Sequence, residues 1–388
     1  MALNDGSILA IRSQFPIFER KIYLNSCSQG ALSKRVEAAF REYLQVWHEH
    51  GSPWDAWIER YEEARGVFAS FIGVDPEEVA LVASASAGVN SVASALGMHD
   101  RRKVVLGEFE FPTMGHIWLA QASRGAQISF IDAENEQLTV EAYERVIDDR
   151  TLIVPLTHVC FRNGFRLPVK EIVEIAHDRG ALVLLDDYQD CGSRPVDVKA
   201  MDLDFYVSGT LKYLLGPAGL AFLYVKKSLA LSLVPSITGW FGQANPFAFD
   251  VKLLEPAPDA RRFQAGTPGI PSVYGASEGA RLLQEIGPHN VASQVGILTR
   301  ALLQGASELG IRSKTPADSV GPLVVLQTKD SDALVKIFAG SGIVVSNRQD
   351  GLRISFHVYN TLDDVRAVLR LLKKNIGLLV STGDSSTA

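Results

Sequence analysis

Apolar and polar positions along the chain follow two periods, one typical of buried strands and one typical of helices. Short, mainly apolar runs recur at residues 79–82, 104–106 and 152–156, and a further strand is expected at 127–131. Apolar runs of this length are typical of parallel strands that are covered on both faces. Helical spacing follows the last of them, at 168–179, where Gly180 predicts the stop. Strand and helix therefore alternate, which predicts an α/β fold built on a doubly wound sheet.

Flanking segments have helical or mixed patterns. Residues 35–71 have helical apolar spacing, and the interruption G-S-P-W at 51–54 predicts two helices there. Late in the chain, an amphipathic helix is expected at 273–285 and strands at 323–327 and 343–346. This later pattern is α+β rather than strictly alternating, which predicts a second, smaller domain.

Four segments are therefore expected along the chain. A large domain should span 21–264, and a small C-terminal domain should span 265–380. The N-terminal segment, 1–20, is expected to pack on the small domain. The polar tail 381–388 reads S-T-G-D-S-S-T-A, and its composition predicts disorder.

Composition narrows the class of protein. With 388 residues, of which 47% are hydrophobic and 21% charged, the chain can bury a large core and favours two domains. A net charge of -6 argues against a nucleic-acid partner, because no basic surface would displace counterions. No apolar run is long enough for a membrane span, and the start M-A-L-N-D-G-S lacks a leader, so we expect a cytoplasmic protein.

Cysteine usage excludes two kinds of site. Cys27, Cys160 and Cys191 lie far apart and form no C-x-x-C pair. The pattern indicates neither a disulfide framework nor a zinc site, and we expect no metal.

One stretch carries the candidate chemistry. The apolar run 181–185 ends in Asp186 and Asp187, and a second run, 205–207, leads through Ser208 and Thr210 to Lys212. A buried acid and a lysine on neighbouring strand ends are what pyridoxal phosphate requires. The lysine forms a Schiff base, and the carboxylate keeps the pyridine nitrogen protonated so that the ring accepts electrons.

Sequence motifs in and around this stretch resemble a known family. D-D-Y-Q, S-G-T-L-K, G-P-A-G and A-F-L-Y-V are similar to the core of the class V aminotransferases, which are fold-type I pyridoxal phosphate enzymes. Relatives in that family include cysteine desulfurases, selenocysteine lyases, isopenicillin N epimerases and kynureninases. The resemblance implies a large doubly wound mixed-sheet domain with a smaller α+β domain, an α-amino acid substrate, and a homodimer with shared active sites.

The resemblance also implies which residues bind the cofactor. Asp186 would contact the ring nitrogen and Gln189 the ring hydroxyl, while Lys212 is the catalytic lysine. Ala85 and Ser86 would lie in the turn that binds the cofactor phosphate, and Phe111 would stack on the ring. Either Ser208 or Thr210 would give the phosphate a hydroxyl near the lysine. Thr267 would reach the phosphate of the partner subunit across the dimer interface. Phe111 can alternatively be a core residue, and the turn 83–90 can be an ordinary N-capped helix start.

Substrate contacts follow from the same resemblance. Arg353, in R-I-S-F-H-V-Y-N-T, stands where the family places its arginine for the substrate α-carboxylate. Asn25 follows the first short strand, His50 lies at the helix break, and Trp240 lies in T-G-W-F-G-Q. For these three residues, capping, solvent and core roles respectively remain open alternatives.

Several positions depart from the family pattern. Cys160 and Phe161 replace a serine and an asparagine, and Leu211 replaces the histidine of desulfurases. Residues 342–351 contain no cysteine, which disfavours a desulfurase that relays sulfur through a persulfide. We therefore expect a class V aminotransferase or a desulfurase-like C–S lyase. An epimerase, a kynureninase-like hydrolase and a catalytically inactive pyridoxal phosphate-binding regulator remain alternatives, whereas a plain Rossmann protein would need a G-x-G-x-x-G motif.

Overall fold

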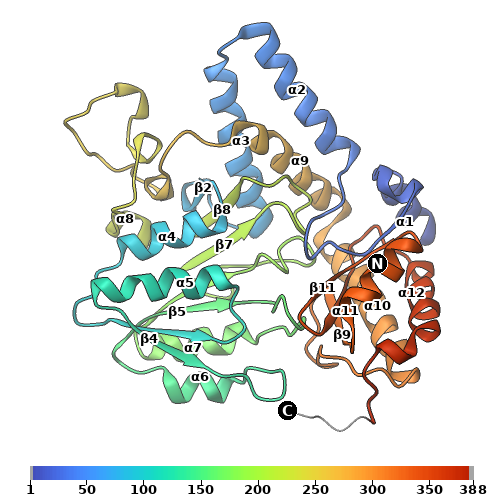
Figure 1. Cartoon of the computed structure of the whole chain (residues 1–388). Helices are drawn as coiled ribbons and strands as arrows, with labels where there is room; N and C mark the ends of the chain where they lie inside the picture. Colours follow the sequence, from blue (N-terminus) through green and yellow to red (C-terminus); the bar gives the residue numbers. More distant parts are fainter. Residues whose placement is uncertain (1–2, 384–388) are drawn as a thin grey trace.

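A central mixed sheet organises the protein (Figure 1). The structure, a computed structural model, describes residues 3–383. The strand order in the sheet is β2-β8-β7-β6-β5-β3-β4. Its strands are β2 Val79–Val82, β3 Lys103–Gly107, β4 Gln127–Ile131, β5 Thr151–Thr157, β6 Leu182–Asp186, β7 Phe205–Gly209 and β8 Ala221–Val225. All neighbours pair in parallel except β8, which runs antiparallel to β2 and β7. The predicted doubly wound mixed sheet is confirmed.

Helices cover both faces of this sheet. They are α3 Trp54–Ile72, α4 Ala85–Ala95, α5 Pro112–Ala120, α6 Val140–Val146, α7 Val169–Asp178 and α8 Lys227–Ser232. Successive side chains of a strand point to opposite faces, so Leu184 packs in one core with α4 and α5, whereas Leu185 packs in the other with α3 and α7. Because both faces are buried, the strands read as continuous apolar runs rather than alternating ones.

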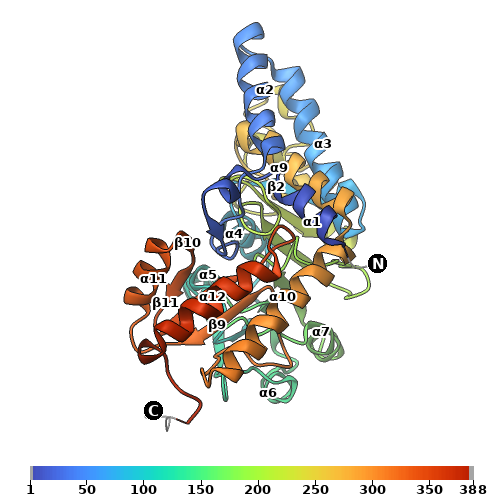
Figure 2. The ribbon, with the colours of Figure 1, turned by 90° about the vertical axis from the view of Figure 1, so that its right-hand side faces the viewer.

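A helical hairpin projects from the sheet domain (Figure 2). It consists of α2 Lys34–His50 and α3, with the turn at 51–53 at its tip. α9 Ile270–Ile286 packs against both helices. The domain boundary expected after residue 264 stays a prediction, but this packing supports a large domain that includes α9. We therefore propose that the boundary lies at Gly287, between α9 and α10.

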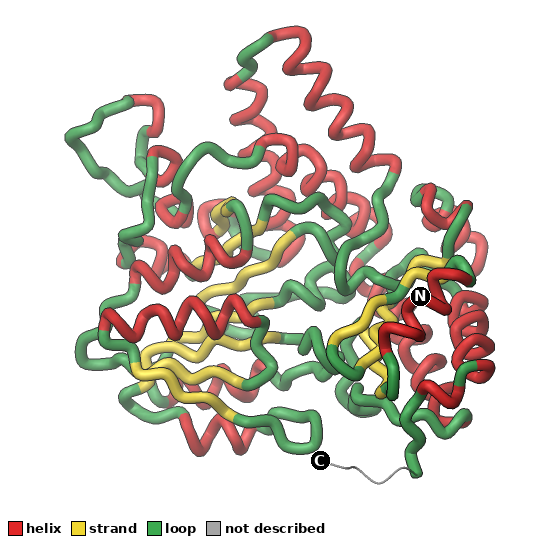
Figure 3. Tube along the Cα trace, viewed as in Figure 1, coloured by secondary structure: helices red, strands yellow, loops and turns green. Residues whose placement is uncertain are grey.

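The C-terminal domain is a small α+β unit. A three-stranded antiparallel sheet, in the order β11-β12-β9, packs against helices, and its separate core contains Leu298, Leu326 and Leu352. The strands are β9 Leu323–Gln327, β11 Ser346–Arg348 and β12 Gly351–Ser355, and the helices are α10 Pro288–Glu308, α11 Ser331–Gly340 and α12 Leu362–Lys374. The tube view shows this sheet separate from the central one (Figure 3).

The N-terminal segment lies on this small domain. β1 Ile22–Tyr23 pairs in parallel with β10 Ile343–Val344. Arg12, at the end of α1 Asp5–Arg12, forms a 2.8 Å ion pair with Asp364 of α12. At the other end of the chain, Thr382 donates a backbone hydrogen bond to Gly310, so the ordered region extends past the start of the expected tail. Residues 384–388 of that tail lie outside the described residues.

Two strands were missing from the sequence-based assignment. β8 entered it only as the motif A-F-L-Y-V, and β12 only as the surroundings of Arg353. The expected strand 343–346 is divided between β10 and β11, which belong to different sheets. Within residues 3–383, no helix is both long and apolar enough to cross a membrane.

Candidate active site

A cavity opens at the carboxyl ends of the central strands. It has a volume of about 260 Å³ and lies where β5, β6 and β7 end and where α4 and α5 begin. This is the edge of an open α/β sheet at which ligands commonly bind. Six of the predicted site residues line it: Lys212, Asp186, Gln189, Ala85, Ser86 and Phe111.

Lys212 lies between two aromatic rings of this cavity. Its Nζ is 4.4 Å from the ring centroid of Tyr188 and 5.8 Å from that of Phe111. Burial lowers the pKa of Lys212 to about 8, although the charge of Asp186 opposes the shift. A pKa near 8 gives a substantial neutral fraction at physiological pH, and the neutral amine is the form that reacts as a nucleophile or base.

Asp186 and Gln189 offer unused hydrogen-bonding atoms. Asp186 Oδ1 accepts the backbone N–H of Tyr188 at 3.0 Å, and burial raises the pKa of Asp186 to about 6. Gln189 Nε2 donates to the carbonyl oxygen of Cys27 at 3.1 Å. Gln189 Oε1 is buried and has no hydrogen-bond partner among the described residues. A buried acceptor without a partner is costly, so this atom indicates a missing donor from a bound group.

The turn before α4 presents backbone N–H groups to the cavity. Ser84 is the N-cap, and its Oγ accepts the N–H of Ala87 at 3.1 Å. Ser86 Oγ donates to Thr113 Oγ1 at 3.2 Å, which fixes both hydroxyls at the cavity wall. A helix N-terminus with small residues at its first positions can hold a phosphate dianion.

Ser208 and Thr210 do not line this cavity, and their role at the cofactor phosphate stays a prediction. Ser208 is fully buried, and its hydroxyl donates to the carbonyl of Gly209 at 3.2 Å. The Thr210 hydroxyl donates to the carbonyls of Pro217 and Leu220, which return past it after the G-P-A-G turn. The hydroxyl of Thr113 is the one that the structure places beside Ser86 instead.

Arg353 does not line this cavity, but its charge acts on Lys212. The side chain comes from β12, is 1% exposed, and donates from Nη2 to Cys27 Sγ at 2.7 Å. Asn25 lies beside Ser355, and its Oδ1 accepts the thiol of Cys27 at 3.7 Å. The positive charges of Arg353 and Arg348 both help to lower the pKa of Lys212, so these groups share one electrostatic environment.

His50 and Trp240 lie away from this cavity, and their roles at the substrate stay predictions. His50 ends α2 at the exposed tip of the hairpin, where its Nε2 lies 4.0 Å from a carboxylate oxygen of Glu49. Trp240 packs its ring against Trp54 and Phe241 and lines a different cavity. Both are therefore outside the Lys212 cavity of their own chain.

Thr267 lies in a third cavity. That cavity is formed by the loop 265–269 and by residues of β2 and α4, including Asn90. Thr267 therefore does not reach Lys212 within one chain. A role at the cofactor phosphate would require a second chain.

Glu110, which precedes the stacking candidate Phe111, was missed by sequence reasoning. It is 8% exposed and accepts the N–H of Thr157 at 2.9 Å and the hydroxyl of Thr157 at 2.7 Å. Burial, with a smaller contribution from the charge of Asp186, raises the pKa of Glu110 to about 8, although the hydrogen bonds from Thr157 oppose the shift. The only sequence signal was its position two residues after Glu108 at the end of β3.

His158 was also missed, and it forms a polar network behind Asp186. Its Nδ1 lies 2.7 Å from Asp187 Oδ1, and Tyr206 donates to the other oxygen of Asp187. Asp187 therefore does more than end a strand, because it anchors the segment that carries Asp186 and Gln189.

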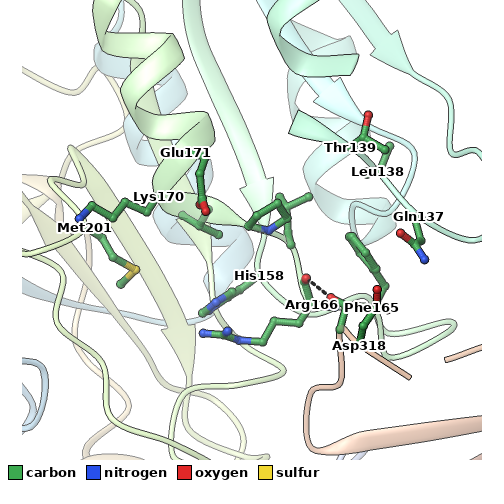
Figure 4. A pocket seen from close by; sticks show the side chains of 14 residues that line it. Gln137, Leu138, Thr139, His158, Phe165, Arg166, Lys170, Glu171, Met201 and Asp318 are labelled. Atoms are coloured by element: carbon green, nitrogen blue, oxygen red, sulfur yellow. Dashed lines mark hydrogen bonds between the residues drawn. The ribbon is translucent and has the colours of Figure 1, made fainter. Parts of the chain in front are cut away.

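His158, Asp187 and Asp190 are close enough together to hold a metal ion. However, Arg166 and Arg194 lie 3.4 and 3.2 Å from Asp190 and supply the compensating positive charge. The group is therefore better explained as an ion-pair network than as a metal centre. Figure 4 shows His158 and Arg166 among the side chains that line another cavity. That cavity has a volume of about 600 Å³, and Lys212 does not line it.

Comparison with known proteins agrees with this geometry. Residues 22–368 match the family described as aminotransferase class-V. An uncharacterized aminotransferase of Bacillus subtilis is 35% identical over 92% of this chain and 94% of its own length. The apo structure of a cysteine desulfurase from Thermococcus onnurineus superposes with a TM-score of 0.86 at 24% identity, covering 97% of this chain and 100% of that chain. A mutant of the enzyme C-DES, with glycine covalently linked to its PLP cofactor, has a TM-score of 0.86 at 22% identity and covers 93% of this chain and 98% of that chain.

Proposed function

Because the chain belongs to the aminotransferase class-V family, we propose that it is a pyridoxal phosphate-dependent enzyme acting at Cα or Cβ of an α-amino acid. The observation that carries this proposal is the meeting of Lys212, Asp186 and Gln189 in one cavity that also contains the N-terminus of α4. Each element of that cavity matches one chemical feature of the cofactor.

The residues present fit pyridoxal phosphate. Lys212 would hold it covalently through Nζ, and Asp186 would pair with the protonated ring nitrogen. Gln189 Oε1, which lacks a partner among the described residues, would accept from the ring hydroxyl. The first N–H groups of α4 and the hydroxyl of Ser86 would hold the phosphate. Phe111 is the expected stacking residue, although 45% of its surface is exposed in the single chain.

When bound, this cofactor supplies an electron-poor ring that stabilises negative charge at Cα of the substrate. The protein supplies the proton transfers. Lys212, whose lowered pKa raises the neutral fraction of its amine, would remove the proton from Cα once the incoming amine had released Nζ. It would then deliver that proton to a second atom, the acceptor carbon in amine transfer or the leaving sulfur in C–S cleavage. Asp186 stays ionised beside the positively charged ring nitrogen, because an opposite charge lowers a carboxyl pKa. Arg353 would hold the substrate carboxylate and orient Cα.

The cavity favours reactions that need a single proton-transferring group. Among its described lining residues, the titratable side chains are Asp186, Tyr188 and Lys212. Burial raises the pKa of Tyr188 well above its ordinary value, so Tyr188 stays protonated. Asp186 would pair with the ring nitrogen. Lys212 is therefore the lining residue that can transfer protons. Amine transfer and β-elimination can proceed with one such group, whereas epimerisation by two bases needs a second one on the opposite side. We therefore propose an aminotransferase or a C–S lyase.

A substrate panel separates these two reactions. The purified holoenzyme is incubated with single amino acids, with and without a keto acid. Keto-acid-dependent amine exchange identifies an aminotransferase, and keto-acid-independent release of pyruvate and sulfide from cysteine or an S-conjugate identifies a C–S lyase. If neither product forms and no Cα proton exchanges into deuterated water, the protein binds the cofactor without using it, and the enzymatic proposal is wrong.

We further propose a cytoplasmic homodimer with shared active sites. Three free thiols fit a reducing compartment. Apolar side chains in the loop 247–254 are unusually exposed, with Phe249 at 72% and Val251 at 94%, which is typical of a surface covered by a partner. Thr267, which lines no wall of its own Lys212 cavity, would contribute to the partner's phosphate site.

Subunit mixing tests the shared site. If Thr267 acts across the interface, Lys212→Ala and Thr267→Arg homodimers should both be inactive, and refolding them together should restore activity. Absence of restored activity in verified heterodimers, or a monomer by light scattering, would contradict the proposal.

A further inference from the structure

Cys27 occupies an unusual position, in contact with the proposed carboxylate arginine. Arg353 Nη2 donates to Cys27 Sγ at 2.7 Å, and each of these residues is only 1% exposed. Arg353 Nε is also buried, and it has no hydrogen-bond partner within residues 3–383. The Arg353 guanidinium is therefore held at Nη2 by Cys27, while the Nε–H group beside it lacks an acceptor among the described residues.

The backbone of Cys27 is fixed from both domains. Its N–H donates to Ser355 Oγ of β12 at 2.9 Å, and its carbonyl accepts from Gln189 Nε2 at 3.1 Å. A few residues later, Gly30 donates its N–H to the carbonyl of Leu211 at 2.7 Å, next to Lys212. Cys27 thus spans the gap between the strand that carries Arg353 and the segment that carries Lys212.

The charged and polar groups around the Cys27 thiol stabilise its contact with Arg353. Burial alone would raise the pKa of Cys27, but the charge of Arg353, with hydrogen bonds from Ser355, Arg353 and Ser346, lowers it below its ordinary value. In contrast, burial raises the pKa of Cys160 and of Cys191. The environment therefore favours negative charge on Cys27, which strengthens its hydrogen bond from Arg353 Nη2 and holds the guanidinium in one orientation.

We propose that Cys27 is a positioning residue that sets the affinity for the substrate α-carboxylate. Its sulfur holds Nη2 of Arg353 in the free enzyme, so that the unpartnered Nε remains as the donor for the carboxylate. This inference rests on the proposed function of Arg353. It also gives Cys27 a role without chemistry at sulfur, since Cys27 does not line the cavity that contains Lys212.

The test compares two ligands that differ only in the carboxylate. Glycine and methylamine are titrated calorimetrically into the holoenzyme and into Cys27→Ala, Cys27→Ser and Cys191→Ala. Cys191→Ala is the matched control, because its thiol is equally buried and has no contact with Arg353. Loss of a hydrogen bond to a charged group corresponds to roughly a tenfold loss of affinity or more. We expect Cys27→Ala to weaken glycine binding by roughly tenfold and to leave methylamine binding unchanged.

The serine variant separates positioning from simple packing. Serine keeps an acceptor beside Arg353 Nη2, so Cys27→Ser should bind glycine with an affinity between those of the wild type and Cys27→Ala. Cys191→Ala should match the wild type for both ligands. Unchanged methylamine binding shows that the variants are folded and loaded with cofactor, so a general structural loss cannot imitate the expected result.

Three outcomes would overturn the inference. The first is equal loss of both ligands in Cys27→Ala, and the second is unchanged or tighter glycine binding in that variant. The third is a persulfide on Cys27 after incubation with cysteine, because the residue would then react rather than position. Arg353→Ala separates this inference from the function on which it rests. If Arg353→Ala weakens glycine and Cys27→Ala does not, only the role of Cys27 fails, whereas unchanged glycine binding in Arg353→Ala refutes the carboxylate site itself.

Discussion

Replacing Glu110 by glutamine should stabilise the protein at neutral pH. The carboxyl group is buried against Thr157, and burial raises its pKa from 4.5 to about 8. In the unfolded chain the group ionises near 4.5, so folding at higher pH must take up a proton. Stability contributed by Glu110 is therefore fully present below pH 4.5 and is lost progressively as the pH rises to 8. At pH 7 the loss amounts to about 3 kcal/mol.

Glutamine removes this cost and keeps the contacts. The Thr157 hydroxyl can turn to accept from the glutamine amide, as it would from a protonated acid. We expect Glu110→Gln to raise the free energy of unfolding by about 3 kcal/mol at pH 7 and to leave it nearly unchanged at pH 4.5. The assay is urea unfolding of wild type and variant across this pH range.

Glu108→Gln is the matched control, because Glu108 lies on the same turn and its pKa is shifted in the opposite direction. The hydrogen bond from the Ala133 N–H, and then Arg162, lower the pKa of Glu108. Replacing Glu108 should therefore reduce the free energy of unfolding at pH values above the pKa that Glu108 has in the unfolded chain. A stability difference for Glu110→Gln that does not change with pH, or a loss of stability at pH 7, would refute the reasoning.

Two further substitutions test local features of the site. Ser84→Ala should lower the free energy of unfolding by about 1 kcal/mol, because Ser84 caps α4, and an unchanged thermal midpoint would contradict the cap. Gly209→Ala should reduce cofactor retention after dialysis, measured by visible absorbance, because its Cβ would overlap the ring of Tyr188 beside Lys212. Gly66→Ala is its control, since a Cβ there meets open space and should leave retention intact.

Most strands were predictable because they are apolar and buried, as β2 and β9 are. The predicted strands 79–82, 127–131 and 323–327 match β2, β4 and β9 to the residue, although β4 is a partly exposed edge strand. The reversed direction of β8 was not predictable, because parallel and antiparallel strands in a covered sheet have the same apolar pattern. The position of α9 was equally hidden, because an amphipathic face does not reveal which domain it packs on.

The positions of site residues at the ends of strands were predictable, whereas the contacts of residues in loops were not. Lys212, Asp186 and Gln189 meet because the carboxyl ends of parallel strands share one edge of the sheet. The hydrogen bonds of Thr210 were not predictable, because its partners, Pro217 and Leu220, follow a later turn of the chain. The distance of His50 from the sheet was not predictable either, because it depends on the direction in which the α2–α3 hairpin projects (Figure 1).

The attachment of pyridoxal phosphate to Lys212 is the central claim, and one measurement tests it most directly. The holoenzyme is reduced with borohydride and digested, and the peptides are analysed by mass spectrometry. The account predicts loss of the visible absorbance band and a single phosphopyridoxyl label on Lys212, with no label in Lys212→Ala. A label on another lysine such as Lys226, or a labelled Lys212→Ala protein, would contradict it.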